Sequence, residues 1–160
     1  MPAKTSDLCD EHADVQACTA DFRGWGRRRR FAGPVRTVRA NDDIAVIREV
    51  LSEPGEGCVL VIDAGGSGRA FFGDYMAGLV VANGWAGVVV NAAVRDAAEI
   101  DAMDVGLKAL ALHPSRGERS GKGERDVPVT FGGASFVPGR WVVADEDGVV
   151  VLPEGMTDSP

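Results

Sequence analysis

Two continuous apolar runs, residues 58–63 and 87–91, constrain the fold more than any other feature of this chain. Apolar runs of this length are typical of strands that are covered on both faces of a sheet. Residues 74–83 lie between the two runs and follow a helical pattern. The resulting strand–helix–strand order predicts an α/β fold.

The segments around this frame predict further strands. Residues 31–40 read as a strand with a kink near a sheet edge at Gly33-Pro34. Shorter strands are expected at residues 106–112, 127–131, 135–137, 141–144 and 148–152. The expected result is a mixed central sheet in one domain, residues 1–152, followed by a flexible tail, residues 153–160.

Helix caps and loop residues complete the expected layout. A first helix should begin at Asp7 with Thr5 or Ser6 as its cap. A second should follow a cap at Asn41 or Asp42, and a short one should run from Asp96 to Ile100. Exposed or tight loops are expected at residues 24–30, 65–68 and 114–124.

Charge and cysteine usage indicate the class of protein. The net charge of −7 argues against nucleic acid as a partner, and the four arginines from Arg27 to Arg30 are expected to lie in a solvated loop. Three cysteines without a C-x-x-C pair suggest reduced thiols, and no secretory segment is evident, so a cytoplasmic location is expected. The longest apolar stretch, residues 79–94, is interrupted by polar residues, and no membrane helix is expected.

A small set of charged residues stands next to the apolar runs. Gly73-Asp74 and Arg95-Asp96 are separated by twenty residues, and Glu99 follows three positions after Asp96. Carboxylates suit hard cations such as Mg²⁺, and arginine suits a planar carboxylate. Because ligand sites in α/β proteins lie at the carboxyl ends of strands, these residues are the candidate site.

The main chain near Gly73 offers a second kind of binding group. The free N–H groups of the first helical turn, at Asp74, Tyr75 and Met76, could bind a substrate carboxylate. Gly73 would allow a ligand to approach the chain closely. The alternative is that the acids only cap helices and that the Arg-Asp pair is a surface ion pair.

Three other chemistries are disfavoured by the sequence. The glycine-rich residues 65–68 lack the order of a nucleotide or S-adenosylmethionine loop. His12 and His113 are isolated, so a histidine zinc site is not expected. Lysine Schiff-base catalysis is disfavoured because Lys4, Lys108 and Lys122 lie far from the motif in sequence.

Several separated motifs occur in a fixed order: Phe31-Ala32-Gly33-Pro34-Val35, Gly73-Asp74, Asn83-Gly84-Trp85-Ala86-Gly87, Val94-Arg95-Asp96 and Phe131-Gly132-Gly133. Together they resemble the family of the regulator of ribonuclease activity A (RraA), which includes class II 4-hydroxy-4-methyl-2-oxoglutarate aldolases. The resemblance implies a swivelling β/β/α fold like that of phosphohistidine domains, and a ring-shaped homotrimer. It extends from about Ser6 to Leu152.

The resemblance also implies roles for the site residues. Asp96 would be the metal ligand, and Arg95 would contact the keto oxygen or carboxylate of the substrate. Residues 73–76 would form the main-chain cradle for pyruvate, while Asp74 and Glu99 would hold metal-bound water.

The reaction that the resemblance implies depends on Mg²⁺ or Mn²⁺. Cleavage of a 4-hydroxy-2-oxo acid, or decarboxylation of oxaloacetate, would leave a pyruvate enolate, with Asp74 and Arg95 as the catalytic residues. The family offers a second function, in which the protein binds and inhibits a ribonuclease or its RNA helicase partners.

Overall fold

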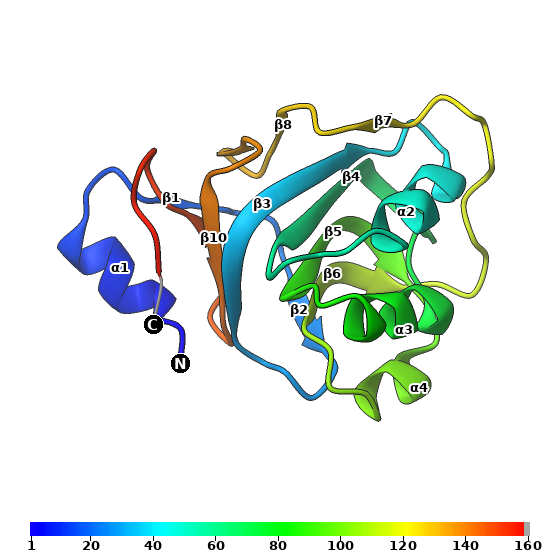
Figure 1. The fold of residues 1–160 in the computed structure, drawn as a ribbon, viewed down its shortest axis with the longest axis horizontal. Coiled ribbons are helices and arrows are strands. Elements are labelled where there is room, and N and C mark those ends of the chain that lie inside the picture. The colour runs from blue at the N-terminus through cyan, green and yellow to red at the C-terminus, as the bar shows by residue number, and fades with distance from the viewer. Residues whose placement is uncertain (159–160) are drawn as a thin grey trace.

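The computed structural model describes residues 1–158, in which a long curved sheet carries helices beside its central strands (Figure 1). Within these residues the helices are α1 (Thr5–Glu11), α2 (Ile44–Leu51), α3 (Asp74–Ala82) and α4 (Ala97–Asp101). The strands are β1 (Gln16–Ala17), β2 (Arg23–Trp25), β3 (Phe31–Arg39), β4 (Val59–Ala70), β5 (Gly87–Val94), β6 (Leu107–Leu112), β7 (Glu124–Arg125), β8 (Val129–Phe131), β9 (Ala134–Phe136), β10 (Trp141–Ala144) and β11 (Val149–Val151). The predicted α/β fold with a mixed central sheet is confirmed.

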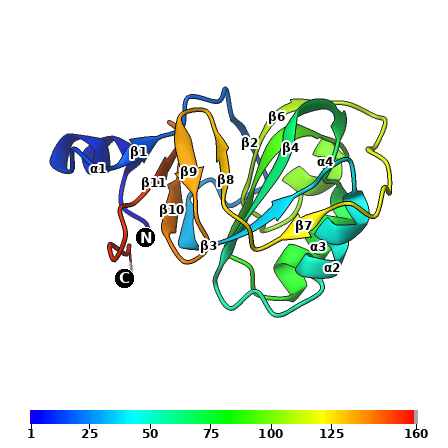
Figure 2. The ribbon, with the colours of Figure 1, turned by 90° about the horizontal axis from the view of Figure 1, so that it is seen from above.

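The main sheet mixes parallel and antiparallel pairs. Its order is β1-β11-β10-β3-β4-β5-β6-β2, and β7 pairs with β3 beside this path. The central strands β3, β4, β5 and β6 are parallel neighbours, whereas β10 and β2 pair antiparallel to them. The hairpin of β8 and β9 lies over this sheet, as Figure 2 shows from above.

Strand β3 lies inside the sheet, so the expectation of an edge at Gly33-Pro34 was wrong. Residues 31–34 pair with β10, and residues 35–39 pair with β4. Pro34 therefore stands where the strand changes partner. At Gly33 a Cβ would lie 2.2 Å from the carbonyl oxygen of Gly57, so only glycine fits this close crossing.

The hydrophobic core has one layer on each face of the central strands. Ile47 and Val50 of α2 pack with Met76 of α3 against Leu60 and Val88 of the sheet. On the other face, side chains of β3, β4 and β5 pack with Phe136 and the strands near the C-terminus. Both layers bury continuous apolar runs, which is why the frame could be predicted from them.

Two helix caps differ from the expected ones. Helix α1 begins at Thr5 without a side-chain cap, because the N–H and hydroxyl of Thr5 both donate to the buried carboxylate of Asp145, each at 2.8 Å. Helix α2 is capped by Asp43, whose carboxylate accepts the N–H of Ala45 at 3.1 Å. Asn41 and Asp42, the expected caps, instead form a left-handed turn before the helix.

Two segments expected as loops are strands. Residues 23–25 form β2, which pairs with β6 and buries Trp25, whereas a loop was expected from Gly24 onward. Strand β4 continues through the glycines at 65–68 to Ala70, with register shifts against β5. Gly65 and Gly66 adopt positive φ there, so the run is an irregular strand rather than a tight loop or a nucleotide loop.

Most of the remaining elements agree with the prediction, whereas the two-residue strands β1 and β7 were not predicted. The C-terminal strands lie where they were expected, and residues 114–124 are mostly exposed. The expected tail lies partly outside the described residues; in its described part, the carboxylate of Asp158 accepts the N–H of Ala3 at 2.9 Å. None of the helices in residues 1–158 is both long and apolar enough to span a membrane.

Candidate active site

The candidate site lies where β4 and β5 end. The N–H of Phe71 donates to the carbonyl of Ala93, and the N–H of Arg95 donates to the carbonyl of Phe72, both at 3.0 Å. The two segments that follow β4 and β5 therefore stay paired beyond the regular strands. Helix α3 then begins at Asp74 and helix α4 at Ala97. This continued pairing places Gly73-Asp74 beside Arg95-Asp96, as the sequence predicted.

Asp96 turns its carboxylate away from its own helix. It stands at the N-cap of α4 in the left-handed region, with φ of 65°, and makes no side-chain hydrogen bond to that helix. Its Oδ2 instead accepts the N–H of Asp74 at 3.0 Å, at the start of α3. A non-glycine residue in this conformation is uncommon, and such residues concentrate at functional sites.

Gly73 makes the contact between the two segments possible. A Cβ at this position would lie 2.6 Å from Oδ2 of Asp96 and 3.5 Å from Cγ of Arg95. Because real Cβ contacts are longer than 2.6 Å, any side chain at position 73 would push the Asp96 carboxylate aside. The glycine therefore fixes the distance between the helix start and the acid.

The two aspartates also interact electrostatically. The pKa of Asp74 is raised, first by its hydrogen bond with the Asp96 side chain, then by burial and by the negative charge of Asp96. The charge of Glu99 raises the pKa of Asp74 further, although Glu99 itself is exposed. The negative charge of Asp96 beside Asp74 makes this a place where added positive charge is favourable.

A cavity of about 310 Å³ opens at this point. Its lining comes from α2, the end of β4, the start of α3, the residues after β5 and the loop after β6: Ile44, Arg48, Ala70, Phe71, Phe72, Gly73, Asp74, Tyr75, Met76, Arg95, Asp96, Arg116 and Arg119. All the predicted site residues except Glu99 are among them. The cavity is large enough for a small organic anion.

The predicted main-chain cradle is partly occupied by the protein itself. The N–H of Asp74 donates to Asp96, and the N–H of Tyr75 contacts the carboxylate of Asp74 and lowers its pKa. A substrate carboxylate that binds this first turn would therefore compete with these carboxylates. Tyr75 is 60% exposed at the cavity, whereas the Met76 side chain is buried.

Arg95 is free to bind an anion. Within residues 1–158, the only hydrogen bond of its side chain goes from Nη1 to the carbonyl of Pro114 at 3.3 Å, and no carboxylate pairs with it there. Arg95 and Asp96 also line a second, smaller hollow next to Leu112 and His113. The two side chains thus share one environment, which a common role requires.

Three cavity arginines were missed by the sequence analysis. Arg48 comes from α2, with its guanidinium 4.3 Å from the centre of the Tyr75 ring, and Arg116 and Arg119 come from the loop after β6. That loop leaves the same edge of the sheet as the other site segments, which was the signal that could have found the latter two. The loop is held there by two isolated backbone β-bridges, one between Ala70 and Arg116 and one between Asp43 and Arg119.

The carboxylates of the site fit a sparsely liganded cation. No group of three or more His, Cys, Asp or Glu side chains in residues 1–158 is placed to enclose a metal ion. Mg²⁺ keeps several waters and is often held by one or two carboxylates plus the substrate, which matches Asp96 and Asp74. No lysine lies among the described residues that line the cavity, which agrees with the case against Schiff-base chemistry.

Comparison with known proteins places this arrangement in context. The family model described as "Aldolase/RraA", RraA-like, matches residues 5–151. A protein of Alkalilimnicola ehrlichii named "Putative 4-hydroxy-4-methyl-2-oxoglutarate aldolase" is 53% identical over an alignment of 161 positions that covers 99% of this chain and 100% of that protein.

Two solved structures share both fold and sequence with the chain. The RNA-processing inhibitor RraA from Thermus thermophilis is 46% identical with a TM-score of 0.92, over 98% of this chain and 96% of that one. A structure from Geobacillus kaustophilus described as an S-adenosylmethionine:2-dimethylmenaquinone methyltransferase is 41% identical with a TM-score of 0.90, over 99% and 96%.

Proposed function

This chain belongs to the RraA-like (Aldolase/RraA) family, and on that premise we propose that it is a divalent-metal-dependent aldolase that releases pyruvate from 4-hydroxy-2-oxo acids. The proposed substrates resemble 4-hydroxy-4-methyl-2-oxoglutarate, and decarboxylation of oxaloacetate is proposed as a second activity. The observation that carries the proposal is the shared cavity of Arg95, Asp96 and Asp74. The name of the 53% identical relative agrees with it.

The side chains suit the charge changes of this reaction. Breaking the C3–C4 bond of the substrate sends an electron pair to the C2 carbonyl and produces the enolate of pyruvate. Arg95, which no carboxylate of residues 1–158 pairs with, would stabilise the negative charge on the C2 oxygen. A bound Mg²⁺ or Mn²⁺ would supply Lewis acidity at the same oxygen.

Proton transfer is the second requirement. The C4 hydroxyl must lose a proton as the bond breaks, and C3 must gain one afterwards. Asp74 has a pKa raised by its neighbour Asp96 and lies in the cavity, so it can orient or exchange such a proton. Asp96 would hold the cation, and Glu99 would act from outside the cavity through its charge.

A coupled assay tests the proposal. Pyruvate release from 4-hydroxy-4-methyl-2-oxoglutarate and from oxaloacetate is followed with lactate dehydrogenase and NADH, against blanks with metal alone. We expect turnover that EDTA abolishes, that Mg²⁺ or Mn²⁺ restores, and that Asp96→Asn lacks while still folded. Absence of metal-dependent turnover above the blanks would refute the enzyme.

The similarity to the RNA-processing inhibitor supports a second candidate function. In that case the chain would bind a ribonuclease or a partner of it, and its net charge of −7 would suit a basic surface. Slower RNA cleavage by a purified ribonuclease, unchanged by Asp96→Asn, would favour the regulator. We also propose a homotrimer, which light scattering would reject by finding a monomer.

A further inference from the structure

The cavity carries more positive charge than the pyruvate part of a substrate requires. Four arginines line it, Arg48, Arg95, Arg116 and Arg119, against two carboxylates, those of Asp74 and Asp96. A pyruvate unit contributes a single carboxylate and a 2-oxo group, for which the proposed function uses the first turn of α3 and Arg95. Three guanidinium groups therefore remain without a substrate group to bind.

These three arginines are also not used within the fold. None of the ion pairs in residues 1–158 includes Arg48, Arg116 or Arg119. Arg116 donates to the carbonyl of Gly117 at 3.2 Å, and Arg48 lies over the ring of Tyr75. Neither contact neutralises the charge of the guanidinium.

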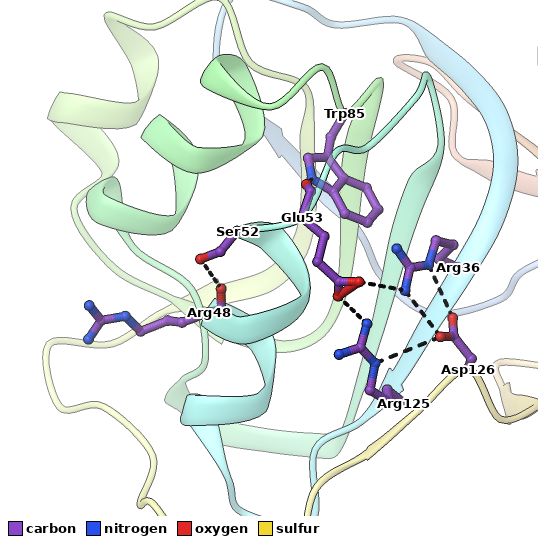
Figure 3. A network of polar contacts seen from close by, with 7 residues as sticks. All are labelled: Arg36, Arg48, Ser52, Glu53, Trp85, Arg125 and Asp126. Carbon is purple, nitrogen blue, oxygen red and sulfur yellow. Dashed lines mark hydrogen bonds and ion pairs between the residues drawn. The ribbon is translucent and has the colours of Figure 1, made fainter.

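Two arginines on β3 and β7 behave differently. Arg36, Glu53, Arg125 and Asp126 form an ion-pair cluster in which each arginine contacts both acids (Figure 3). Arg48 extends away from this cluster on the other side of α2, although it is only five residues from Glu53. The acids of the cluster therefore leave the charge of Arg48 unpaired.

We infer that Arg48, Arg116 and Arg119 bind a second carboxylate of the substrate, at the end opposite the 2-oxo group. This inference rests on the proposed function and deepens it, because it makes these arginines the residues that select 2-oxo dicarboxylates over monocarboxylates. A guanidinium and a carboxylate form paired hydrogen bonds of fixed geometry, which a methyl group cannot replace. Arg48 is half-buried and should contribute most, because Arg116 and Arg119 are exposed and screened by water.

The test uses two ligands that cannot be cleaved and differ only at the distal end. 2-Oxoglutarate carries a carboxylate at C5 and 2-oxopentanoate a methyl group, and neither has the C4 hydroxyl. Calorimetric titration in the presence of Mg²⁺ should show the wild type binding 2-oxoglutarate about 10- to 100-fold more tightly. Arg48→Gln should reduce this preference about tenfold and Arg116→Gln or Arg119→Gln a few-fold, with 2-oxopentanoate binding unchanged.

A matched control and a parallel assay make the result decisive. Arg28 is an exposed arginine that pairs with Asp104 at 2.9 Å outside the cavity, so Arg28→Gln should keep the full preference. Equal binding of the two ligands by the wild type, binding of neither, or a preference that survives loss of all three arginines would overturn the inference. A preference without any pyruvate release in the coupled assay would sustain it and refute the aldolase instead.

Discussion

The two sides of helix α2 use arginine in opposite ways. After its last turn, the ion-pair cluster brings two arginines and two acids together, with Arg36 and Asp126 in contact through two hydrogen bonds of 3.1 and 3.2 Å. On the cavity side, four arginines face a hollow with no ion pair among them in the described chain.

The difference distinguishes arginines that stabilise the fold from arginines that are available to bind a ligand. In the cluster, Glu53 follows α2, Arg36 lies on β3, and Arg125 and Asp126 lie at β7, so paired charges tie three segments together. In the cavity, charges that are not paired leave room for an anion and a cation from outside. Arginines that the sequence alone does not distinguish can thus be assigned a structural or a binding role from the presence or absence of an acidic partner.

Arg95→Gln should show the largest effect of any single change in this comparison. The uncharged side chain cannot stabilise the developing oxyanion, and we expect kcat for pyruvate release to fall about 10²- to 10³-fold. Arg125→Gln is the matched variant in the ion-pair cluster and should keep the wild-type kcat. Steady-state kinetics on both variants test this, and equal losses would remove the distinction between the cavity and the ion-pair cluster.

Gly73→Ala should have the next largest effect. The new Cβ would meet Oδ2 of Asp96 at 2.6 Å and move the carboxylate off the N–H of Asp74, and we expect kcat/KM to fall about tenfold to a hundredfold. Gly78→Ala, on the same helix with open space around it, should leave kcat/KM unchanged. Thermal unfolding of both variants shows whether the loss is local to the site.

Raising the salt concentration should have a smaller effect than either substitution, and it acts on substrate binding at the cavity. Raising ionic strength from about 0.05 M to 1 M shortens the Debye length to about 3 Å and screens exposed charges. We expect KM for a 2-oxo dicarboxylate to rise a few-fold because Arg116 and Arg119 are exposed. An unchanged KM would mean that these two arginines do not attract the substrate.

Glu53→Gln should have the smallest effect. It removes the acid that both Arg36 and Arg125 contact, at a position that is partly exposed, so the free energy of unfolding should fall by about 1 kcal/mol or less. Urea unfolding measures this change. Pyruvate release should be unaffected, and a marked loss of activity would show that the cluster and the cavity are coupled.

The sequence predicted the central strands and the helix between them better than the helix caps and connecting segments. Apolar runs and their spacing located β4, α3 and β5, because burial on both faces leaves a clear pattern. The strand at Trp25 was missed because it depends on pairing with β6, which is distant in sequence. The cap of α2 lies at Asp43, next to the two predicted cap residues, because all three residue types are favoured at a helix start. The glycines at 65–68 were read as a loop because sequence alone does not show that a neighbouring strand continues beside them.

The candidate site was predictable to a similar extent. Residues next to the apolar runs, from Gly73 to Met76 and at Arg95 and Asp96, do line one cavity. Arg48 shares a cavity with them only because α2 packs beside α3, and Arg116 and Arg119 because their loop folds back toward β4 and α2. Such contacts follow from tertiary packing and leave no local pattern.

The central claim is that Asp96 and Arg95 hold a divalent cation and a carboxylate in one cavity. Electron paramagnetic resonance of Mn²⁺, with and without oxalate as a planar analogue of the enolate, tests it most directly. The wild type should bind Mn²⁺, with oxalate tightening the binding; Asp96→Asn should lose the metal, and Arg95→Gln only the effect of oxalate. Wild-type Mn²⁺ affinity in Asp96→Asn, or an oxalate effect that survives in Arg95→Gln, would contradict the account.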